Sequence, residues 1–151
     1  MKNWLLSSVV AAVGLVAVSG AKADTFTYGS FTLNGAQPVT ITSPVSQTVF
    51  AGQIDLHGAG ANAGQDLLVW CLDLLTNLLP GPYTYQIDPL TTAGAGFGNP
   101  TLTTTQITEI GDLMKFGNSG TDPDLAATQL AIWKIEYPGF ATLGLSSTLQ
   151  K

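Results

Sequence analysis

The sequence is poor in charged residues and contains no arginine. Of its 151 residues only 10% are Asp, Glu, Lys or Arg, against about 25% in a typical soluble domain. Five lysines face ten acids, and the formal net charge is −5. Without a basic patch the chain lacks the charge that attracts a phosphate backbone or an anionic membrane surface, so nucleic-acid binding is excluded.

Cysteine and histidine are also scarce, with one residue of each, Cys71 and His57. A single cysteine excludes an intrachain disulfide and any cysteine-rich zinc site. A single histidine excludes the metal motifs that need several histidines. We therefore expect neither a bound metal nor a cofactor.

The first 23 residues have the order of a secretory signal peptide. Lys2 gives a short positive start, an almost uninterrupted apolar run covers 4–18, and small residues ending in Ala23 precede Asp24. This order predicts export and cleavage after Ala23, because the apolar run is short for a bilayer span of about 20 residues. Residues 24–151 then form a single module, outside the cell or at its surface.

The first half of this module, residues 24–90, carries the signals of β-strands. Apolar and polar residues alternate over 25–33, Asn34-Gly35 predicts a turn, and the alternation resumes over 38–42. A third strand is expected over 45–56, interrupted near Gly52.

A glycine-rich loop at 58–64 separates these strands from a continuous apolar run at 67–75. Such a run predicts a central strand that is covered on both faces. One more strand is expected at 83–87, followed by a flexible connection at 91–99.

Residues 101–138 have a helical period instead. Ile107, Ile110 and Met114 are spaced for one helix that ends at Gly117. Asp122 is a good N-cap for a second helix over 125–137, with Pro123 at its first position. Strands followed by two helices predict an α+β fold.

Two short segments draw attention within this pattern, Trp70-Cys71-Leu72-Asp73 in the expected central strand and 127–133 (Ala-Thr-Gln-Leu-Ala-Ile-Trp) in the second helix. Cys71 in an apolar run is typical of a small buried hydrophobe. Gln129 lies on an otherwise apolar helix face, where its amide needs hydrogen-bond partners.

Together the two segments resemble the thioester domains of bacterial surface adhesins. The resemblance covers roughly 69–137 and includes an aromatic-Cys-aliphatic triplet and a Thr-Gln-x-Ala-Ile-Trp motif. It implies an antiparallel β-sandwich with a small two-helix subdomain toward the C-terminus. A Cys–Gln bond is then expected where the two parts meet.

The same segments are similar to those of exported PEP-CTERM proteins of Gram-negative bacteria. Those proteins carry Cys-x-Asp-Leu, here 71–74, and Gln-x-Ala-Ile-Trp-(Lys/Glu)-Ile-Glu-Tyr, here 129–137. Their C-terminal Pro-Glu-Pro, transmembrane helix and basic tail are absent, and nothing near Lys151 is typical of a closing strand or sorting signal. We expect the chain to be truncated at its C-terminus, with membrane anchoring only through a missing segment.

The resemblance implies an internal thioester, formed when the Cys71 thiolate attacks the side-chain carbonyl of Gln129 and ammonia leaves. A surface nucleophile, either a protein amine or a polysaccharide hydroxyl, would then be captured. Trp70 and Trp133 adjoin the two residues and are expected to shield the bond, besides packing in the core, and Asp73 is a supporting residue. The expected function is an attachment module and not a turnover enzyme.

A structural alternative remains open, namely a non-covalent surface or matrix protein in which Cys71 and Gln129 are core residues. An enzymatic alternative is a cysteine hydrolase, with His57 as the base and Asp55 or Asp73 orienting it. Otherwise His57 is typical of a solvated loop residue.

A calcium site is the third alternative, because Asp122 and Asp124 could supply two carboxylates. The twelve-residue ligand loop of calcium-binding hands is missing, however. Helix capping explains both acids without a metal.

Overall fold

The computed structural model describes residues 24–75, 77–87 and 100–144. In chain order its elements are β1 (Asp24–Ser43), β2 (Gln47–Gly58), a 3₁₀ turn (Gly60–Asn62), β3 (Asp66–Val69), β4 (Tyr83–Ile87), α1 (Thr104–Gly117), α2 (Asp122–Glu136) and β5 (Ala141–Leu143). The α+β class is confirmed. The expected signal peptide and the flexible connection at 91–99 lie outside the described residues.

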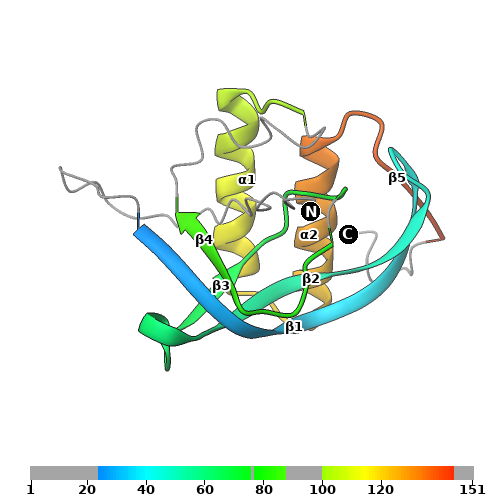
Figure 1. Ribbon diagram of the computed structural model, residues 1–151. Coiled ribbons are helices and arrows are strands. Elements are labelled where there is room, and N and C mark those ends of the chain that lie inside the picture. Colours follow the sequence, from blue (N-terminus) through cyan, green and yellow to red (C-terminus); the bar gives the residue numbers. More distant parts are fainter. Residues whose placement is uncertain (1–23, 76, 88–99, 145–151) are drawn as a thin grey trace, which may run out of the picture.

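All five strands belong to one curled antiparallel sheet (Figure 1). The strand order is β3-β2-β1-β4, and β5 pairs with the far end of β1. The expected sandwich is therefore not confirmed, since the described strands form no second sheet and helices cover the inner face instead. β5 is a short closing strand that the sequence did not predict.

β1 is one long strand, where two strands joined by a turn were expected. Its register against β2 shifts between Asn34 and Gln37, while only Gly52 intervenes on the opposite strand. This is a β-bulge, because two residues face one and the chain does not reverse. The predicted turn at Asn34-Gly35 was wrong because β2 is long enough to pair with both halves of β1. β2 runs unbroken from Gln47 to Gly58, so the predicted interruption near Gly52 was wrong, and the irregularity lies in β1 opposite Gly52.

Gly35 joins this bulge to the helical layer. Its φ of 60° is a left-handed conformation that favours glycine. A Cβ added there would lie 2.5 Å from the carbonyl oxygen of Asp122. The bulge therefore brings the backbone of the sheet against the first turn of α2.

Both helices lie close to their predicted positions. Thr103 and Gln106 form a capping box at the start of α1, which ends at Gly117 as predicted. The N-cap of α2 is Thr121 and not the expected Asp122, because the Asp124 carboxylate accepts hydrogen bonds from the Thr121 backbone N–H and hydroxyl. Neither helix has the length and apolar character to cross a membrane, and the described ranges hold no other candidate.

The two helices lie side by side on the inner face of the curled sheet (Figure 1). α2 contacts β1 and β2, while α1 packs against α2. Along β2, Ile54 and Leu56 are buried in a cluster with Phe26 and other residues of the strands and their loops, and Asp55 and His57 alternate with them toward the outer face. The molecule thus offers two separate settings for chemistry, a sheet–helix junction and an outer sheet face.

Candidate functional site

The segment that carries Cys71 is not the central strand that the sequence predicted. β3 ends at Val69 and lies at the edge of the sheet, next to β2. Residues 70–74 leave the sheet without strand pairing. The apolar run was misleading because Trp70, Leu72 and Leu74 are buried in clusters with helical residues and not within a sheet.

Gln129 of α2 takes the place of a neighbouring strand for this segment. Its Oε1 accepts a hydrogen bond from the Cys71 backbone N–H at 3.0 Å, and its Nε2 donates to the Cys71 carbonyl at 2.7 Å. The side-chain amide thereby satisfies both backbone groups of Cys71, as a peptide group of a paired strand does. Only 1% of Gln129 is exposed. The structure therefore brings together the two residues that the sequence singled out.

Tyr137, directly after α2, also binds the backbone of this segment, at Leu72 and Leu74. Its hydroxyl accepts a hydrogen bond from the Leu74 backbone N–H at 3.2 Å and lies 3.4 Å from the Leu72 carbonyl, to which it donates. Polar side chains of the helical layer thus hold residues 71–74 in place. The orientation of Cys71 depends on α2 rather than on the sheet.

The thiol of Cys71 is directed along its own segment and donates to the Asp73 carbonyl at 3.0 Å. Burial raises its pKa to about 12, and the negative charges of Asp73 and Glu136 act in the same direction. At neutral pH the group is a thiol and not a thiolate. It lacks the low pKa by which cysteine hydrolases keep their nucleophile ionised.

Glu136 is a further residue of this site, which the sequence analysis missed. It is fully buried, and neither carboxylate oxygen has a hydrogen-bond partner. Burial, reinforced by the charge of Asp73, raises its pKa to about 8. The spacing of Leu125, Gln129, Ile132 and Glu136 at alternating steps of four and three residues places them on one helix face. That spacing could have revealed Glu136.

The expected shielding residues separate into two clusters. Trp133 shares its apolar cluster with Cys71, whereas Trp70 packs with Ile110, Met114 and other residues of the two helices. The Trp70 indole N–H is held by the Asn118 side chain at 3.2 Å. Trp133 is therefore the better candidate for excluding water from Cys71, and Trp70 anchors the start of the segment.

Asp73 has both a backbone and a side-chain part in this geometry. Its carbonyl accepts the thiol hydrogen bond, and its Oδ1 accepts from the Leu75 backbone N–H at 2.8 Å. Its negative charge raises the pKa of Cys71 and of Glu136. Asp73 thus disfavours a second charge at the junction, which suits chemistry between neutral groups.

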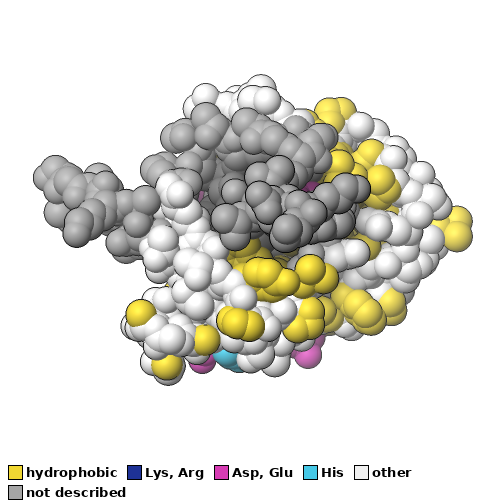
Figure 2. Space-filling model, viewed as in Figure 1, with side chains coloured by type: hydrophobic (Ala, Val, Ile, Leu, Met, Phe, Trp, Pro, Cys, Tyr) yellow, Lys and Arg dark blue, Asp and Glu magenta, His cyan; other side chains and the backbone are white. Residues whose placement is uncertain are grey.

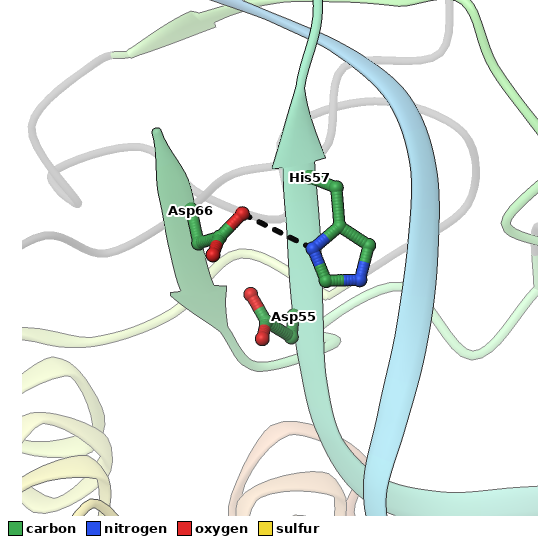
Figure 3. Close-up of side chains that lie close together, drawn as sticks. All are labelled: Asp55, His57 and Asp66. Atoms are coloured by element: carbon green, nitrogen blue, oxygen red, sulfur yellow. Dashed lines mark hydrogen bonds and ion pairs between the residues drawn. The ribbon is translucent and has the colours of Figure 1, made fainter. Parts of the chain in front are cut away.

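His57 does not meet Cys71. It lies on β2, not in a loop, with Nδ1 3.1 Å from Asp66 Oδ1 and Nε2 3.3 Å from the Thr32 hydroxyl. Figure 3 shows Asp55 and Asp66 turned toward the imidazole on the same face of the sheet. The Cys–His pair of the hydrolase alternative is therefore not assembled, and the bonds of His57 lead to another cluster.

The junction places a half-buried thiol beside a buried carboxamide, and the buried carboxyl group of Glu136 acts on the thiol electrostatically. Such groups are suited to acyl transfer between side chains, because desolvated reactants in contact need no further ordering. No protein-family model, no curated protein and no solved structure matches the chain.

Proposed function

We propose that the chain is an exported attachment module in which Cys71 and Gln129 form an internal thioester that captures a nucleophile. The observation that carries the proposal is the double hydrogen bond between the buried Gln129 amide and the backbone of Cys71. The thiol belongs to the same residue as those backbone groups.

Thioester formation exchanges one bond for another without an external reactant. The Cys71 sulfur attacks the side-chain carbonyl carbon of Gln129, the C–N bond breaks, and the thiol proton leaves with the amide nitrogen as ammonia. Because the thiol is neutral, the proton must be removed during the attack. Glu136 is a buried carboxyl group whose charge acts on this thiol, and a carboxyl group that moves into contact could pass the proton to the departing nitrogen.

The sulfur is the nucleophile when the thioester forms and the leaving group when the target is captured. An amine or hydroxyl attacks the thioester carbonyl, its proton passes to the leaving sulfur, and the target is left joined to residue 129 through an amide or ester. Burial of Gln129 protects the activated acyl group from hydrolysis until the target displaces the covering side chains. The reaction occurs once per molecule, as attachment requires.

One observation favours a second function, that of a non-covalent structural surface protein. The two Gln129 hydrogen bonds already satisfy the buried backbone of Cys71, so the amide has a structural role without any covalent chemistry. In that case Cys71 is a packed core thiol. The two functions differ in whether the amide nitrogen is retained in the mature protein.

The intact mass of the secreted, unreduced protein tests this difference. A thioester makes the wild type about 17 Da lighter than its sequence through loss of ammonia, and it leaves no thiol for an alkylating reagent. Methylamine should then add about 31 Da and release one thiol. The same mass reports whether the chain is cleaved after Ala23.

Cys71→Ala and Gln129→Glu are the matched controls, since the first lacks the sulfur and the second has no ammonia to lose. Both should show the full sequence mass and no reaction with methylamine. A wild type of full mass with a thiol that reacts after unfolding would contradict the thioester and favour the structural function.

A further inference from the structure

We propose a second site on the outer face of the sheet, where Asp55, His57 and Asp66 bind a divalent transition-metal ion of the zinc type. Asp55 and His57 are two residues apart on β2 and share a face, and Asp66 is paired with His57 from β3. The three side chains converge in Figure 3. The proposal is independent of the thioester, because none of these residues belongs to the junction.

The donor atoms have a spacing that a small cation requires. One ligand atom from each of the three side chains lies within 4.8 Å of the others, and His57 Nδ1 is 3.1 Å from Asp66 Oδ1. Around tetrahedral zinc, with bonds of about 2.0–2.2 Å, neighbouring ligand atoms are roughly 3.3 Å apart. The His57–Asp66 pair already has this separation, and only Asp55 must move closer.

A second observation at Asp55 points to a ligand. Its Oδ1 is buried from solvent, yet it has no hydrogen-bond partner. A buried carboxylate oxygen without a donor is costly. A cation between Asp55 and the other two residues supplies the missing positive partner, whereas the His57–Asp66 contact alone leaves that oxygen unsatisfied.

The other nitrogen of His57 is also arranged as at a metal site. Nε2 lies 3.3 Å from the Thr32 hydroxyl on β1. Metal-binding histidines donate their remaining N–H to such an acceptor, which fixes the ring and the tautomer. A hydroxyl can accept as well as donate, so Thr32 suits the tautomer that leaves Nδ1 free to bind an ion.

The donor set selects the kind of cation. Calcium and magnesium prefer oxygen ligands alone, whereas imidazole with carboxylates suits zinc and neighbouring transition metals. Asp66 is well exposed, so water can complete the coordination. Our expectation of no metal rested on motifs with several histidines or cysteines, and it did not consider one histidine with two carboxylates.

Zinc titration of tag-free protein tests the proposal, with a chromophoric chelator as competitor. We expect one equivalent to bind, and Co²⁺ to give the visible bands of a site with four or five ligands. His57→Gln and Asp66→Asn should each weaken zinc binding at least tenfold, about the lower limit for loss of even an outer partner at a metal site. Both substitutions lie at the surface, and circular dichroism checks that the variants fold.

Two controls exclude other zinc ligands. Cys71→Ala should keep full affinity, which separates this site from the thiol. Asp112→Asn removes an exposed carboxylate of α1 that pairs with Lys115 and should also have no effect. Undetectable binding, unchanged affinity in His57→Gln, or tighter binding of Ca²⁺ than of Zn²⁺ would each overturn the proposal.

Discussion

The two faces of the sheet hold similar polar groups under opposite conditions. In the inner junction (Cys71, Gln129, Glu136 and Tyr137) only Cys71 is partly exposed, and Glu136 is fully inaccessible to solvent. The outer cluster (Asp55, His57 and Asp66) lies at the edge of the molecule, where Figure 2 shows histidine and acidic side chains together, and Asp66 is 63% exposed. The difference decides which chemistry each can perform.

Burial at the inner junction keeps its titratable groups neutral. The pKa values of Cys71 and Glu136 are both raised chiefly by desolvation, so neither group is charged in most molecules at neutral pH. In the proposed thioester reaction, neutral and desolvated groups favour acyl exchange over hydrolysis. The outer cluster keeps contact with solvent, which a labile metal ion needs for entry and for its water ligands.

The two regions also differ in what holds them together. Gln129 of α2 and Tyr137 directly after it bind the backbone of residues 71–74, so the inner junction is part of the fold. The strands β2 and β3 are already paired through their backbones, and the outer cluster adds one side-chain contact between them. Substitutions at the inner junction should therefore affect stability far more than substitutions at the outer cluster.

Gln129→Ala should give the largest effect. It leaves the buried N–H and C=O of Cys71 without partners, at about 1–3 kcal/mol each, so we expect the free energy of unfolding to fall by about 3 kcal/mol. Cys71→Ala retains both backbone groups and should lose only about 1 kcal/mol. Urea denaturation of the two variants at pH 7 measures the difference.

Neither variant can form a thioester, so the difference between them contains no contribution from the loss of that bond. Equal stability of the two variants would mean that Gln129 does not hold the segment, and the inner junction would lose its structural role.

Glu136→Gln should change the pH dependence of stability. The ordinary carboxyl pKa of 4.5 is raised to about 8 by burial in the folded protein. Between these values the folded chain keeps a proton that the unfolded chain releases, so wild-type stability declines as pH rises toward 8, by up to about 1.4 kcal/mol per pH unit. Urea denaturation at pH 5, 6.5 and 8 should show that this decline is reduced in Glu136→Gln.

Glu109→Gln, an exposed acid on α1, is the control and should leave the wild-type pH profile unchanged. A Glu136→Gln profile parallel to that of the wild type would show that Glu136 is not held neutral.

Gly35→Ala tests the contact between the bulge and α2 on which the inner junction depends. The substitution places a Cβ at φ 60° and 2.5 Å from the Asp122 carbonyl oxygen, so we expect a loss of about 2 kcal/mol. Gly111→Ala is the matched control, because its Cβ meets nothing within 4 Å and alanine is the better helix former by up to about 1 kcal/mol. Thermal unfolding should show shifts of opposite sign.

The sequence predicted those parts of the molecule whose signals are local. The helical period located α1 and α2. Gln129 was identified because it is a polar residue on an otherwise apolar helix face. The contact of Gln129 with Cys71 was predicted through motif resemblance, and the double hydrogen bond accounts for it physically. Local signals sufficed here because helix ends and helix faces are determined by residues that are close together in the sequence.

The remaining features depend on long-range pairing. Gly35 and Ala36 form a bulge because β2 extends past the predicted turn. The apolar run at 67–75 leaves the sheet after Val69 because Gln129 and Tyr137 supply its hydrogen-bond partners. Asp66 gave no signal of its own, since its nearness to His57 follows from the β2–β3 register. Strand register and the choice between sheet and helix as a partner are set by tertiary packing.

Asp66→Asn should give the smallest effect on the metal-free protein. The His57–Asp66 pair is partly exposed, and such surface pairs contribute about 0–1 kcal/mol, so urea denaturation in the presence of a chelator should barely distinguish the variant from the wild type. Zinc at a hundredfold excess over its Kd should stabilise the wild type by about 2.7 kcal/mol, and a variant that binds at least tenfold more weakly by no more than about 1.4 kcal/mol. Asp66→Asn would thus change the free energy of unfolding only when zinc is present. Gln129→Ala, in contrast, should lower it without any metal. An Asp66→Asn variant that unfolds readily in chelator would instead make the outer cluster part of the fold, and the contrast between the two faces would fail.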